Sequence, residues 1–513
     1  MNLSLRSLLI PLVLFAIFFA ALAWVQFATP DLPDNDGYYH IRFAELMRRE
    51  GLKPAFPWLP LTVLNPREFY DHHFLFHAGL VPFTFGDLRL GAKWAAVFNA
   101  ALAFLAVWLL LRGQHISWAW LWALGLLAVS QAFLYRMSIT RAQSLSLAVL
   151  ALGLHWMLTG RYRWLLPLGF FYVWLYNAFP LLPALALVYA GGSWLSGNRL
   201  ELRPLGWSLL GVGLGLLVNP YFPQDIFFAV RHFLPKLTDP TAIRVGSEWY
   251  PYNTGQLLEN SPLALAAFMG GALALGLHPG RWDRRTATAF LLAALFGLML
   301  FQARRFIEYF PPFALIFAAF AWQPLLDAWA AAARRDAPLP AWLEQLDRPR
   351  LNSLARHLRP ALPALLLLLL LIPGVYRSLE DARAAMRTSK PHNLYAAASA
   401  WLQANTPAGE RVFQTDWDDF PRLFYYNTHN TYLIGLDPTY LQLYDPDRYV
   451  LWEKITRGEV DEISAAVPSR FGARYILTDL LHDDFLDRAT ADPGLKEVYR
   501  DDQAAIFEVV MPR

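Results

Sequence analysis

The apolar run LLIPLVLFAIFFAALAWV, Leu8–Val25, decides which class of fold this chain can adopt. It has no charged residue and approaches the roughly 20 apolar residues that an α-helix needs to cross a bilayer. Arg6 precedes it, as a basic residue precedes a signal peptide, but Trp24 occupies the place where small residues would mark a cleavage site. We therefore expect a retained first span, which the chain leaves through the polar segment NDGYYHIR, Asn35–Arg42.

The composition of the whole chain indicates a membrane protein with many spans. Of the 513 residues, 56% are hydrophobic and 17% are charged, whereas soluble domains contain about 25% charged residues. The net charge is only +3, so the chain lacks the basic excess of a nucleic-acid binder, and we expect no nucleic-acid partner. The absence of cysteine excludes disulfides, thiolate nucleophiles and cysteine-ligated metals.

Apolar runs separated by polar segments predict about eleven membrane spans, with about thirteen as the upper limit. The cores of the expected spans are Leu8–Val25, Trp94–Leu111, Ser117–Phe133, Leu145–Leu158, Trp164–Trp174, Leu181–Trp194, Leu205–Val218, Leu263–Leu277, Ala287–Phe301, Phe306–Trp322 and Ala361–Val375. Several of these are short. Pro180 and Pro183 favour two spans, rather than one broken helix, between Trp164 and Trp194.

Arginine is concentrated in every second loop, and this asymmetry sets the expected orientation. If the first span runs from inside to outside, the inner loops contain Arg112, Arg161, Arg163, Arg203, Arg281, Arg284, Arg285 and the arginine-rich stretch Arg334–Arg359. The outer face then receives Asn35–Leu88, Tyr135–Arg141, Tyr221–Ser261, Gln302–Arg305 and everything after Gly374. We expect an integral, multi-pass protein of a bacterial or archaeal plasma membrane, in contact with membrane lipids, whose C-terminal part lies outside the cytoplasm.

The character of the sequence changes near residue 377, where charges become frequent and apolar runs shorten. The segments RVFQT, TYLIGL, ARYILTD and AAIFEVV predict strands, and LYAAASAWLQA and RYVLWEKITRG predict helices. We therefore predict an α-helical multi-spanning membrane domain over residues 1–376, with outer-face loops 30–88 and 220–261. A small soluble α/β domain is expected to follow over residues 377–513.

Five groups of polar residues fall on the outer side of this expected topology. They are Asp34 and Asp36; Arg136 and Arg141; Ser247 and Glu248; Arg304 and Arg305; and Asp416, Asp418 and Asp419. Acids and arginines beside hydrocarbon are costly and usually functional. Acids can bind a divalent metal or orient a nucleophile, and arginine can hold phosphate through two hydrogen bonds. Together these groups suit the breaking of a bond to a lipid-linked phosphate.

Each of these groups also has a simpler interpretation. Asp36 has the residue type and position of an N-cap for the amphipathic helix that follows it. Arg304 and Arg305 are suited to anchoring at the membrane interface. Glu248 lies in a loop rich in Trp and Tyr, where an ordinary exposed acid would be unremarkable.

The segment YDHHFLFH contains His72, His73 and His77 together with Asp71. His73 and His77 are four residues apart and would share one face of a helix, a spacing that metal sites also use. Nothing else in the sequence requires a histidine metal site, and the role of this segment stays open.

Taken in chain order, the outer segments resemble the catalytic subunit of oligosaccharyltransferases, within the membrane-embedded C-type glycosyltransferases. NDGYYHIR resembles the first outer-loop motif of that family, whose acid, here Asp36, binds the metal and contacts the acceptor. VGSEWYPY is similar to a later-loop motif with a glutamate, here Glu248. ARRFIEYFPP resembles the segment that contacts the lipid-linked phosphate, which maps onto Arg305 with Arg304 beside it.

The segment TDWDDFPRLFYY is similar to the Trp-Trp-Asp motif that opens the C-terminal domain of that family and reads the acceptor. Trp417 and Asp418 match the motif, whereas its first Trp is Asp416 here. The order of the motifs and the side on which they fall agree with the family over most of the chain.

One segment departs from the family pattern. LYRMSITRAQSLS retains Arg136 but has Arg141 and Gln143 where the family has a second acidic motif. The resemblance implies a divalent cation, Mn²⁺ or Mg²⁺, and this departure leaves Asp36 and Glu248 as its ligands, with Asp34 or a histidine as candidates for a further one. The alternative is metal-free catalysis in which Arg141 replaces the charge of the cation.

The resemblance implies an oligosaccharyltransferase-like enzyme that transfers a sugar or oligosaccharide from a polyprenyl phosphate or pyrophosphate donor to a protein, lipid or glycan acceptor on the outer face. The site residues that it implies are Asp36 and Glu248 for catalysis; Arg136, Arg141, Arg304 and Arg305 for the donor phosphate; and Tyr38, Trp417 and Asp418 for the acceptor. Two alternatives stay open: the same fold as a glycan polymerase or ligase, and a catalytically inactive membrane assembly subunit. A transporter is disfavoured because the acids lie at span ends and no inverted halves are visible.

The position of the C-terminus can be tested directly. A reporter that is active only outside the cytoplasm is expected to be active when fused after Arg513, because an odd number of expected spans precedes it. The same reporter fused in the inner loop after Arg112 should be inactive. A C-terminal fusion that is active only with a cytoplasmic reporter would contradict the orientation.

Overall fold

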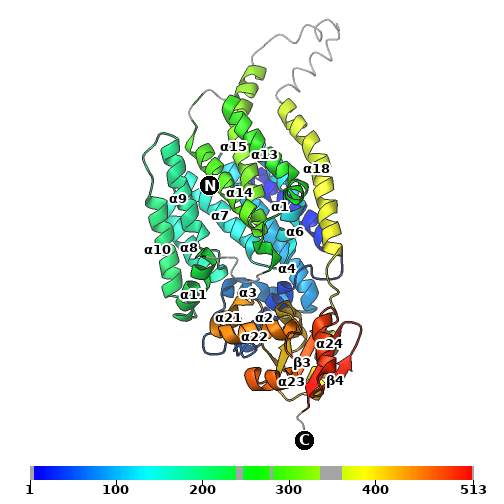
Figure 1. The fold of residues 1–513 in the computed structure, drawn as a ribbon. Helices are drawn as coiled ribbons and strands as arrows, with labels where there is room; N and C mark the ends of the chain where they lie inside the picture. Colours follow the sequence, from blue (N-terminus) through cyan, green and yellow to red (C-terminus); the bar gives the residue numbers. More distant parts are fainter. Residues whose placement is uncertain (1–4, 239–245, 278–279, 281, 335–360, 511–513) are drawn as a thin grey trace.

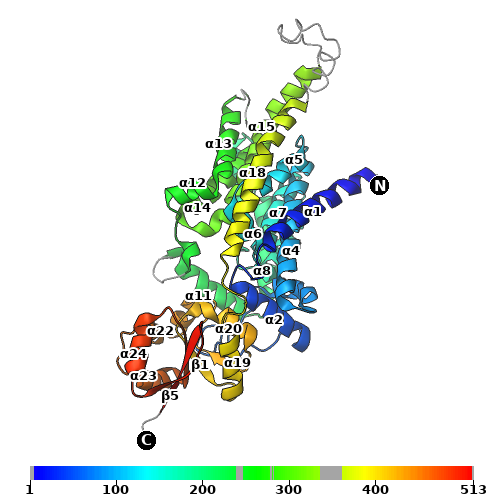
Figure 2. The ribbon, with the colours of Figure 1, turned by 90° about the vertical axis from the view of Figure 1, so that its right-hand side faces the viewer.

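The helices form one elongated body, and a small sheet lies at one end of it (Figures 1 and 2). The computed structural model describes residues 5–238, 246–277, 280, 282–334 and 361–510. Helices satisfy every backbone N–H and C=O group within the segment, so they suit long apolar runs in lipid. The fully buried residues Phe18, Ala100, Leu150 and Phe317 come from four different helices and belong to one apolar core.

The body contains the helices up to Arg387, in chain order. They are α1 (Leu5–Gln26), α2 (Asp36–Glu50), α3 (Phe74–Leu80), α4 (Leu88–Gly113), α5 (Ala119–Leu124), α6 (Gln131–Ser138), α7 (Gln143–Leu158), α8 (Leu165–Leu175), α9 (Leu181–Leu195), α10 (Arg203–Leu217), α11 (Gln224–Thr238), α12 (Thr254–Asn260), α13 (Pro262–Leu277), α14 (Arg284–Gln302), α15 (Phe310–Arg334) and α18 (Leu362–Arg387). Two short 3₁₀ helices, η4 (Ser247–Trp249) and η5 (Arg304–Glu308), carry residues of the expected site.

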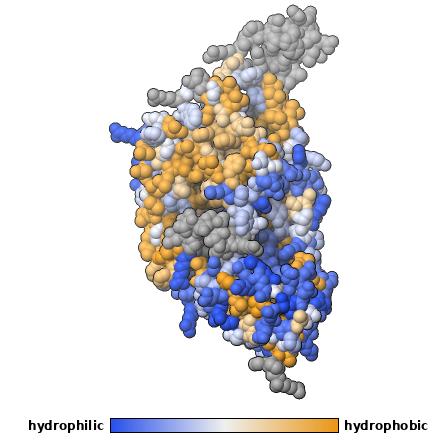
Figure 3. All heavy atoms as spheres, viewed as in Figure 1, coloured by the Kyte–Doolittle hydropathy of each residue, from blue (hydrophilic) through white to orange (hydrophobic). Residues whose placement is uncertain are grey.

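Several helices have the length and composition of membrane spans. Within the described residues, those long enough to span alone are Leu9–Gln26, Leu88–Gly113, Arg284–Gln302, Phe310–Ala332 and Leu362–Arg387. Two bent helix pairs, α6 with α7 and α12 with α13, would bring this number to seven. The face in Figure 3 is largely apolar over the helical body and hydrophilic over the end that holds the sheet. A mostly helical protein with several apolar helices is thereby confirmed, while the number of spans stays a prediction.

One expected span, Ser117–Phe133, is wrong as a single helix. The chain there forms α5, a 3₁₀ turn at Gly125–Leu127 and the start of α6. Trp118 has a positive φ of 52° before α5, and the Ser130 side chain accepts a hydrogen bond from a backbone N–H in α6. A serine cap starts a new helix, so the apolar composition of this stretch conceals a break.

The C-terminal part forms a mixed sheet with helices around it. Its strands are β1 (Arg411–Gln414), β2 (Thr431–Tyr432), β3 (Tyr475–Asp479), β4 (Leu495–Arg500) and β5 (Ala504–Val509), and its helices are α19 (Ala396–Asn405), α20 (Phe420–Tyr426), α21 (Thr439–Tyr444), α22 (Pro446–Thr456), α23 (Ile463–Ala466) and α24 (Asp483–Ala491). The strand order is β2-β1-β3-β5-β4, in which β1 pairs in parallel with β2 and β3, and β5 pairs antiparallel with β3 and β4. All four expected strands and both expected helices are present, and β4 is additional. The soluble character of this part and the boundary at residue 377 stay predictions.

The loop between α2 and α3 packs against the C-terminal part. The backbone N–H of Val63 donates to the carbonyl of Tyr440 at 3.1 Å, and that of Tyr432 donates to the carbonyl of Trp58 at 2.8 Å. Residues from both parts share one buried core, which includes Phe43, Phe56, Phe69, Phe420 and Phe424. This packing fixes the start of α2, and with it Asp36, relative to the C-terminal part.

Candidate active site

Asp36 lies in the first turn of α2 and faces Arg141. The N-cap position of α2 is Asn35, and no side chain accepts a hydrogen bond there, so Asp36 is not the cap that its position suggests. Instead, Oδ2 of Asp36 lies 2.9 Å from Nη2 of Arg141. A carboxylate in the first turn is also favoured by the helix dipole.

Arg141 lies in the break between α6 and α7, where the two helices bend by 107°. Its guanidinium donates to both carboxylate oxygens of Asp34, from Nε at 2.6 Å and from Nη2 at 2.7 Å. Nη1 lies 3.4 Å from Oε2 of Glu248. One guanidinium therefore bridges three carboxylates: those of the neighbouring Asp34 and Asp36 and that of Glu248, which lies much further along the chain.

Glu248 of η4 is held by two further arginines. Nη1 of Arg136 donates to its Oε2 at 2.9 Å, and Nη1 of Arg305 lies 3.6 Å from its Oε1. Nε of Arg136 also donates to Glu308 at 2.8 Å. Only 1% of the Glu308 side chain is exposed, so Arg136 neutralises an acid that would otherwise be buried without a counter-charge.

Arg305 is oriented by two aromatic residues. Its guanidinium lies over the ring of Trp249, 4.2 Å from the centroid, and Nη2 donates to the hydroxyl of Tyr176 at 3.2 Å. Its contact to Glu248 is the longest of the three arginine contacts made by that acid. Because a guanidinium has five N–H donors, Arg305 retains donors for a ligand.

Burial and the neighbouring arginines shift the pKa values of the two expected catalytic acids, Asp36 and Glu248, in opposite directions. Burial raises the pKa of Asp36 to about 7; Arg141 opposes this shift, while Asp34, Asp418 and Glu248 reinforce it. Burial alone would also raise the pKa of Glu248, but the surrounding arginines hold that pKa well below its usual value. Two acids whose pKa values are pushed apart are typical of a site in which they have different roles.

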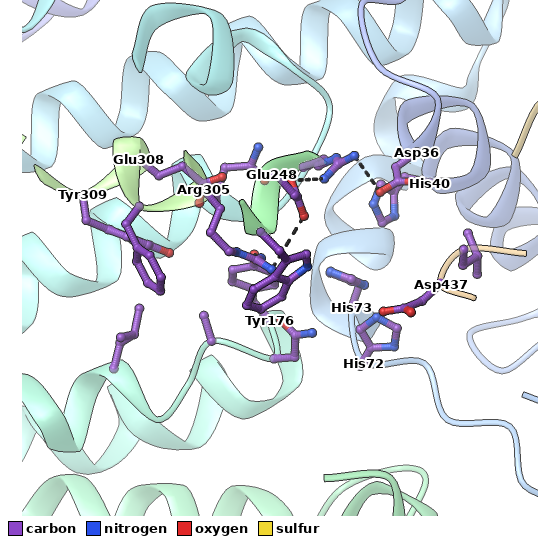
Figure 4. A pocket seen from close by; sticks show the side chains of 18 of the residues that line it. Asp36, His40, His72, His73, Tyr176, Glu248, Arg305, Glu308, Tyr309 and Asp437 are labelled. Atoms are coloured by element: carbon purple, nitrogen blue, oxygen red, sulfur yellow. Dashed lines mark hydrogen bonds and ion pairs between the residues drawn. The ribbon is translucent and has the colours of Figure 1, made fainter. Parts of the chain in front are cut away.

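These residues line a cavity of about 470 Å³ between the helical body and the C-terminal part. Figure 4 shows Tyr309 and Glu308 toward one end, Asp36, His72 and Asp437 toward the other, and Arg305 and Glu248 between them. The lining also includes the apolar residues Pro180, Leu181, Met299 and Phe306. The cavity therefore combines apolar lining residues with the arginine–acid network.

A second cavity of about 310 Å³ adjoins the first. Glu248 and Arg305 line both cavities, whereas Arg304 and Arg136 line only the second. Arg304 donates from Nε to the carbonyl of Pro251 at 3.1 Å. The two expected phosphate-binding arginines of η5 thus share the second cavity, and only Arg305 also reaches the cavity that contains Asp36.

The C-terminal segment around Trp417 and Asp418 also reaches the site. Asn35 donates to Oδ2 of Asp418 at 2.6 Å, directly beside Asp36 in the chain. Gly246 lies so near the Trp417 ring that a Cβ atom built on it would be 3.8 Å away. Burial raises the pKa of Asp418 to about 6, with Asp416 adding to the shift. This segment therefore contacts both acidic segments of the site.

Tyr38 does not line either cavity. Its ring is fully buried and lies under the guanidinium of Arg422, 4.4 Å from the centroid. Arg422, itself 1% exposed, donates to Oδ1 of Asn35 at 2.7 Å. Tyr38 thus packs beneath the start of α2, and its expected contact with the acceptor stays a prediction.

The metal site expected at Asp36 and Glu248 does not fit the observed donor set. Arg141 contacts both carboxylates and so occupies the space between them. Within the described residues, no group of three or more His, Cys, Asp or Glu side chains is placed to bind a metal ion. A divalent cation needs several oxygen ligands around it, whereas these oxygens already accept from a guanidinium.

The architecture matches solved membrane glycosyltransferases. The oligosaccharyltransferase AglB of Archaeoglobus fulgidus, solved with an inhibitory peptide and a dolichol-phosphate, has a TM-score of 0.63 at 14% identity, over 94% of this chain and 71% of AglB. ArnT of Cupriavidus metallidurans, bound to undecaprenyl phosphate, has a TM-score of 0.56 at 16% identity, over 98% of this chain and 99% of ArnT. The arabinofuranosyltransferase AftD from Mycobacteria has a TM-score of 0.55 at 15% identity, over 97% of this chain and 40% of AftD.

The chain has the C-type glycosyltransferase fold. The resemblance inferred from the sequence motifs is thereby confirmed at the level of the fold. No protein-family model matches the sequence, and no curated protein matches it either. The sequence identity to these solved structures is too low for a comparison of whole sequences to reveal the fold. The structure and a few short motifs reveal it instead.

Sequence reasoning missed two residues of the arginine–acid network. Glu308 lies within the expected span Phe306–Trp322, and an acid inside an apolar run is itself a functional signal. Asn35 has no charge and gives no such signal, yet it joins Asp418 to Arg422. Only the folded chain shows these contacts.

We expect Asp36 to titrate near pH 7, since burial raises its pKa to about 7. Difference infrared spectra between wild type and Asp36→Asn should show a protonated carboxyl band that disappears as pH rises through the neutral range. Arg141→Gln should move this transition to higher pH, because it removes the cation that stabilises the carboxylate. If the protonated carboxyl band of Asp36 is already lost in mildly acidic buffer, the raised pKa is wrong.

Proposed function

We propose that this protein is a membrane glycosyltransferase that moves a sugar or oligosaccharide from a polyprenyl phosphate or pyrophosphate donor to an acceptor on the outer face of the membrane. The observation that supports this most directly is the position of Arg305. It lines the 470 Å³ cavity, between Tyr309 and the end that contains Asp36.

The cavity suits a donor with a lipid and a phosphate. The elements α9, α14 and η5 contribute apolar lining residues, among them Leu181 and Met299, and α14 is long and apolar enough to span a membrane. A polyprenyl chain would lie against these residues, and its phosphate would meet Arg305. Arginine binds phosphate through a planar fork, and AglB and ArnT were each solved with a polyprenyl phosphate bound.

The end of the cavity that contains Asp36 suits the acceptor. Asp36 would orient the nucleophile, which attacks the anomeric carbon of the sugar. The bond from that carbon to the phosphate oxygen breaks, and the electron pair leaves with the phosphate. Arg305 would stabilise the charge that develops on the departing phosphate, while Glu248 holds Arg305 and Arg141 in place. Because Asp36 must be a carboxylate for this role, activity should increase as pH rises through about 7.

Arg141 would supply the positive charge that a divalent cation supplies in the sequence-based expectation. It contacts Asp34 and Asp36 within 2.9 Å and lies close to Glu248. A guanidinium remains protonated at any working pH, so it neutralises the acids without a bound ion. One structure of the Archaeoglobus fulgidus enzyme is a complex with Zn and sulfate, and a cation therefore stays the alternative that the test below addresses.

A second candidate has the same donor and a lipid or glycan acceptor. The chain covers 99% of ArnT but only 71% of AglB, the neighbour that was solved with a peptide. Part of the peptide-bound enzyme thus lies outside the match, whereas nearly all of ArnT lies within it, and this difference in coverage favours the second candidate.

The function can be tested with a panel of donors. Purified full-length protein in liposomes is given undecaprenyl and dolichyl phosphates and pyrophosphates carrying radiolabelled sugars, with an envelope extract as the acceptor source. We expect one donor class to release its sugar. Arg305→Lys should slow release by about ten- to a hundredfold and Arg305→Ala by more, because a charge-assisted contact is worth roughly 1.5–3 kcal/mol.

Arg285→Lys is the matched control for Arg305→Lys. Arg285 is also an arginine at a helix end, where it contacts Asp283 and the carbonyl of Gln114 and lines neither cavity. Its replacement should leave release unchanged. Equal rates in wild type and both Arg305 variants would make Arg305 an interfacial anchor, and no release from any donor by wild type would favour the inactive assembly subunit.

Metal removal separates the two sources of positive charge. We expect EDTA to leave donor turnover within about twofold of its untreated value, and added Mn²⁺ or Mg²⁺ to have no effect. Arg141→Gln should lower turnover by roughly 100-fold or more, since it leaves three acids without their shared cation. Inhibition by EDTA that Mn²⁺ or Mg²⁺ reverses would instead establish a metal enzyme.

A further inference from the structure

A chain of three buried side chains leads from the protein interior to the first cavity. Nδ1 of His77 lies 2.8 Å from Oδ2 of Asp71, and Nε2 of His77 lies 2.7 Å from Nδ1 of His40. Asp71 is 2% exposed, His77 is 0% exposed and His40 is 3% exposed. Burying an acid and two imidazoles in series costs desolvation energy that an apolar core would avoid.

The hydrogen bonds specify where the protons of this chain lie. The carboxylate of Asp71 can only accept, so Nδ1 of His77 is protonated. In a neutral imidazole the other nitrogen is then an acceptor, so Nε2 of His77 accepts from Nδ1–H of His40. By the same logic, Nε2 of His40 has a free lone pair. Asp71 is held in place because its other oxygen accepts from the backbone N–H of His73 at 3.0 Å.

His40 is the end of this chain that meets the cavity. It lies four residues after Asp36 on α2, so the two side chains share one helix face, and both line the cavity. Figure 4 shows the imidazole of His40 beside the carboxylate of Asp36. Within the described residues, Nε2 of His40 has no protein hydrogen-bond partner.

We propose that His40, His77 and Asp71 form a proton relay in which His40 accepts the proton of the attacking acceptor. This rests on the proposed transferase function and adds the base that the function requires. As the nucleophile bonds to the anomeric carbon and the phosphate leaves with its electron pair, the nucleophile's proton moves to Nε2 of His40. The proton on Nδ1 of His40 passes to Nε2 of His77, and the resulting imidazolium is paired with the Asp71 carboxylate.

The environment of His40 favours the neutral imidazole, which is the form that a base must have before the reaction. Burial lowers the pKa of His40 well below its usual value, and the neighbouring His77 and Arg141 add to this shift. An isolated base of this kind would accept a proton poorly. The buried Asp71 removes this weakness, because the positive charge arrives next to a negative one. Asp36, already bonded to Arg141, is left to position the nucleophile.

The tautomer of His40 can be measured without any substrate. In the purified full-length protein with ¹⁵N-labelled histidine, we expect His40 to show a protonated Nδ1 and an unprotonated Nε2, with His40→Gln assigning the signals. In Asp71→Asn we expect the other tautomer of His40, with Nδ1 unprotonated and Nε2 protonated. The amide oxygen of the substituted side chain would keep the bond from the His73 N–H, so its NH₂ group would face His77 and force Nε2–H toward His40. The same His40 tautomer in Asp71→Asn and wild type, or a protonated Nε2 in wild type, would overturn the relay.

Turnover provides the second measurement, with whichever donor of the panel wild type uses. General bases contribute about 10²–10⁴-fold, so His40→Gln and Asp71→Asn should each lower kcat by roughly 100-fold while the KM for the donor stays within about twofold. Azide as the nucleophile has no proton to lose, so its transfer should be equal in wild type and both variants. If azide transfer falls as far as transfer to the natural acceptor, the residues are structural and the relay is wrong.

Asp31→Asn is the matched control for Asp71→Asn. Asp31 makes a similar contact, 2.8 Å to Nδ1 of His392, but lines neither cavity. Its replacement should change neither the His40 signals nor kcat. If Asp71→Asn fails to fold, His40→Gln decides the catalytic question. If wild type uses no donor, the proposed function fails, whereas the ¹⁵N signals still decide whether the relay is assembled.

Discussion

The site depends on the guanidinium of Arg141, which is shared by three carboxylates. Asp34, Asp36 and Glu248 would repel one another if brought together without a cation, and each would lose hydration on burial. Arg141 removes both penalties at once by donating to Asp34 through two hydrogen bonds while contacting the other two acids. It can do so because the chain bends by 107° between α6 and α7, and Arg141 lies at this break.

The rest of the network follows from this arrangement. Arg136, one turn before the break, links Glu248 to the buried Glu308, and Glu248 in turn lies next to Arg305. Acids and arginines thus alternate from the start of α2 to η5. A charged chain of this kind holds its members rigidly, and rigidity is what an active site needs if its dipoles are to stabilise charge without reorganising.

The C-terminal part contributes by fixing the start of α2. Asn35 is held between Asp418 and Arg422, and the buried Arg422 covers the ring of Tyr38. The cavity therefore has one wall from the helical body and another from the C-terminal part. His40 joins the same wall to the buried pair His77 and Asp71. An acid that orients a nucleophile and a base that accepts its proton would then share a single helix.

The sequence by itself determined the helical fold class, the presence of both helices and strands in the C-terminal part, and most of the charged residues that the candidate site contains. It did so because apolar runs, charge asymmetry and short motifs are local properties of the chain. Tertiary structure alone decided that Ser117–Phe133 breaks, that Tyr38 is buried, and that Arg141 lies between the acids where a metal was expected. It also decided the meaning of the histidine segment, since His77 meets His40 across 37 residues of sequence. Contacts at such separations depend on how helices bend and pack, and no local pattern of residues encodes that geometry.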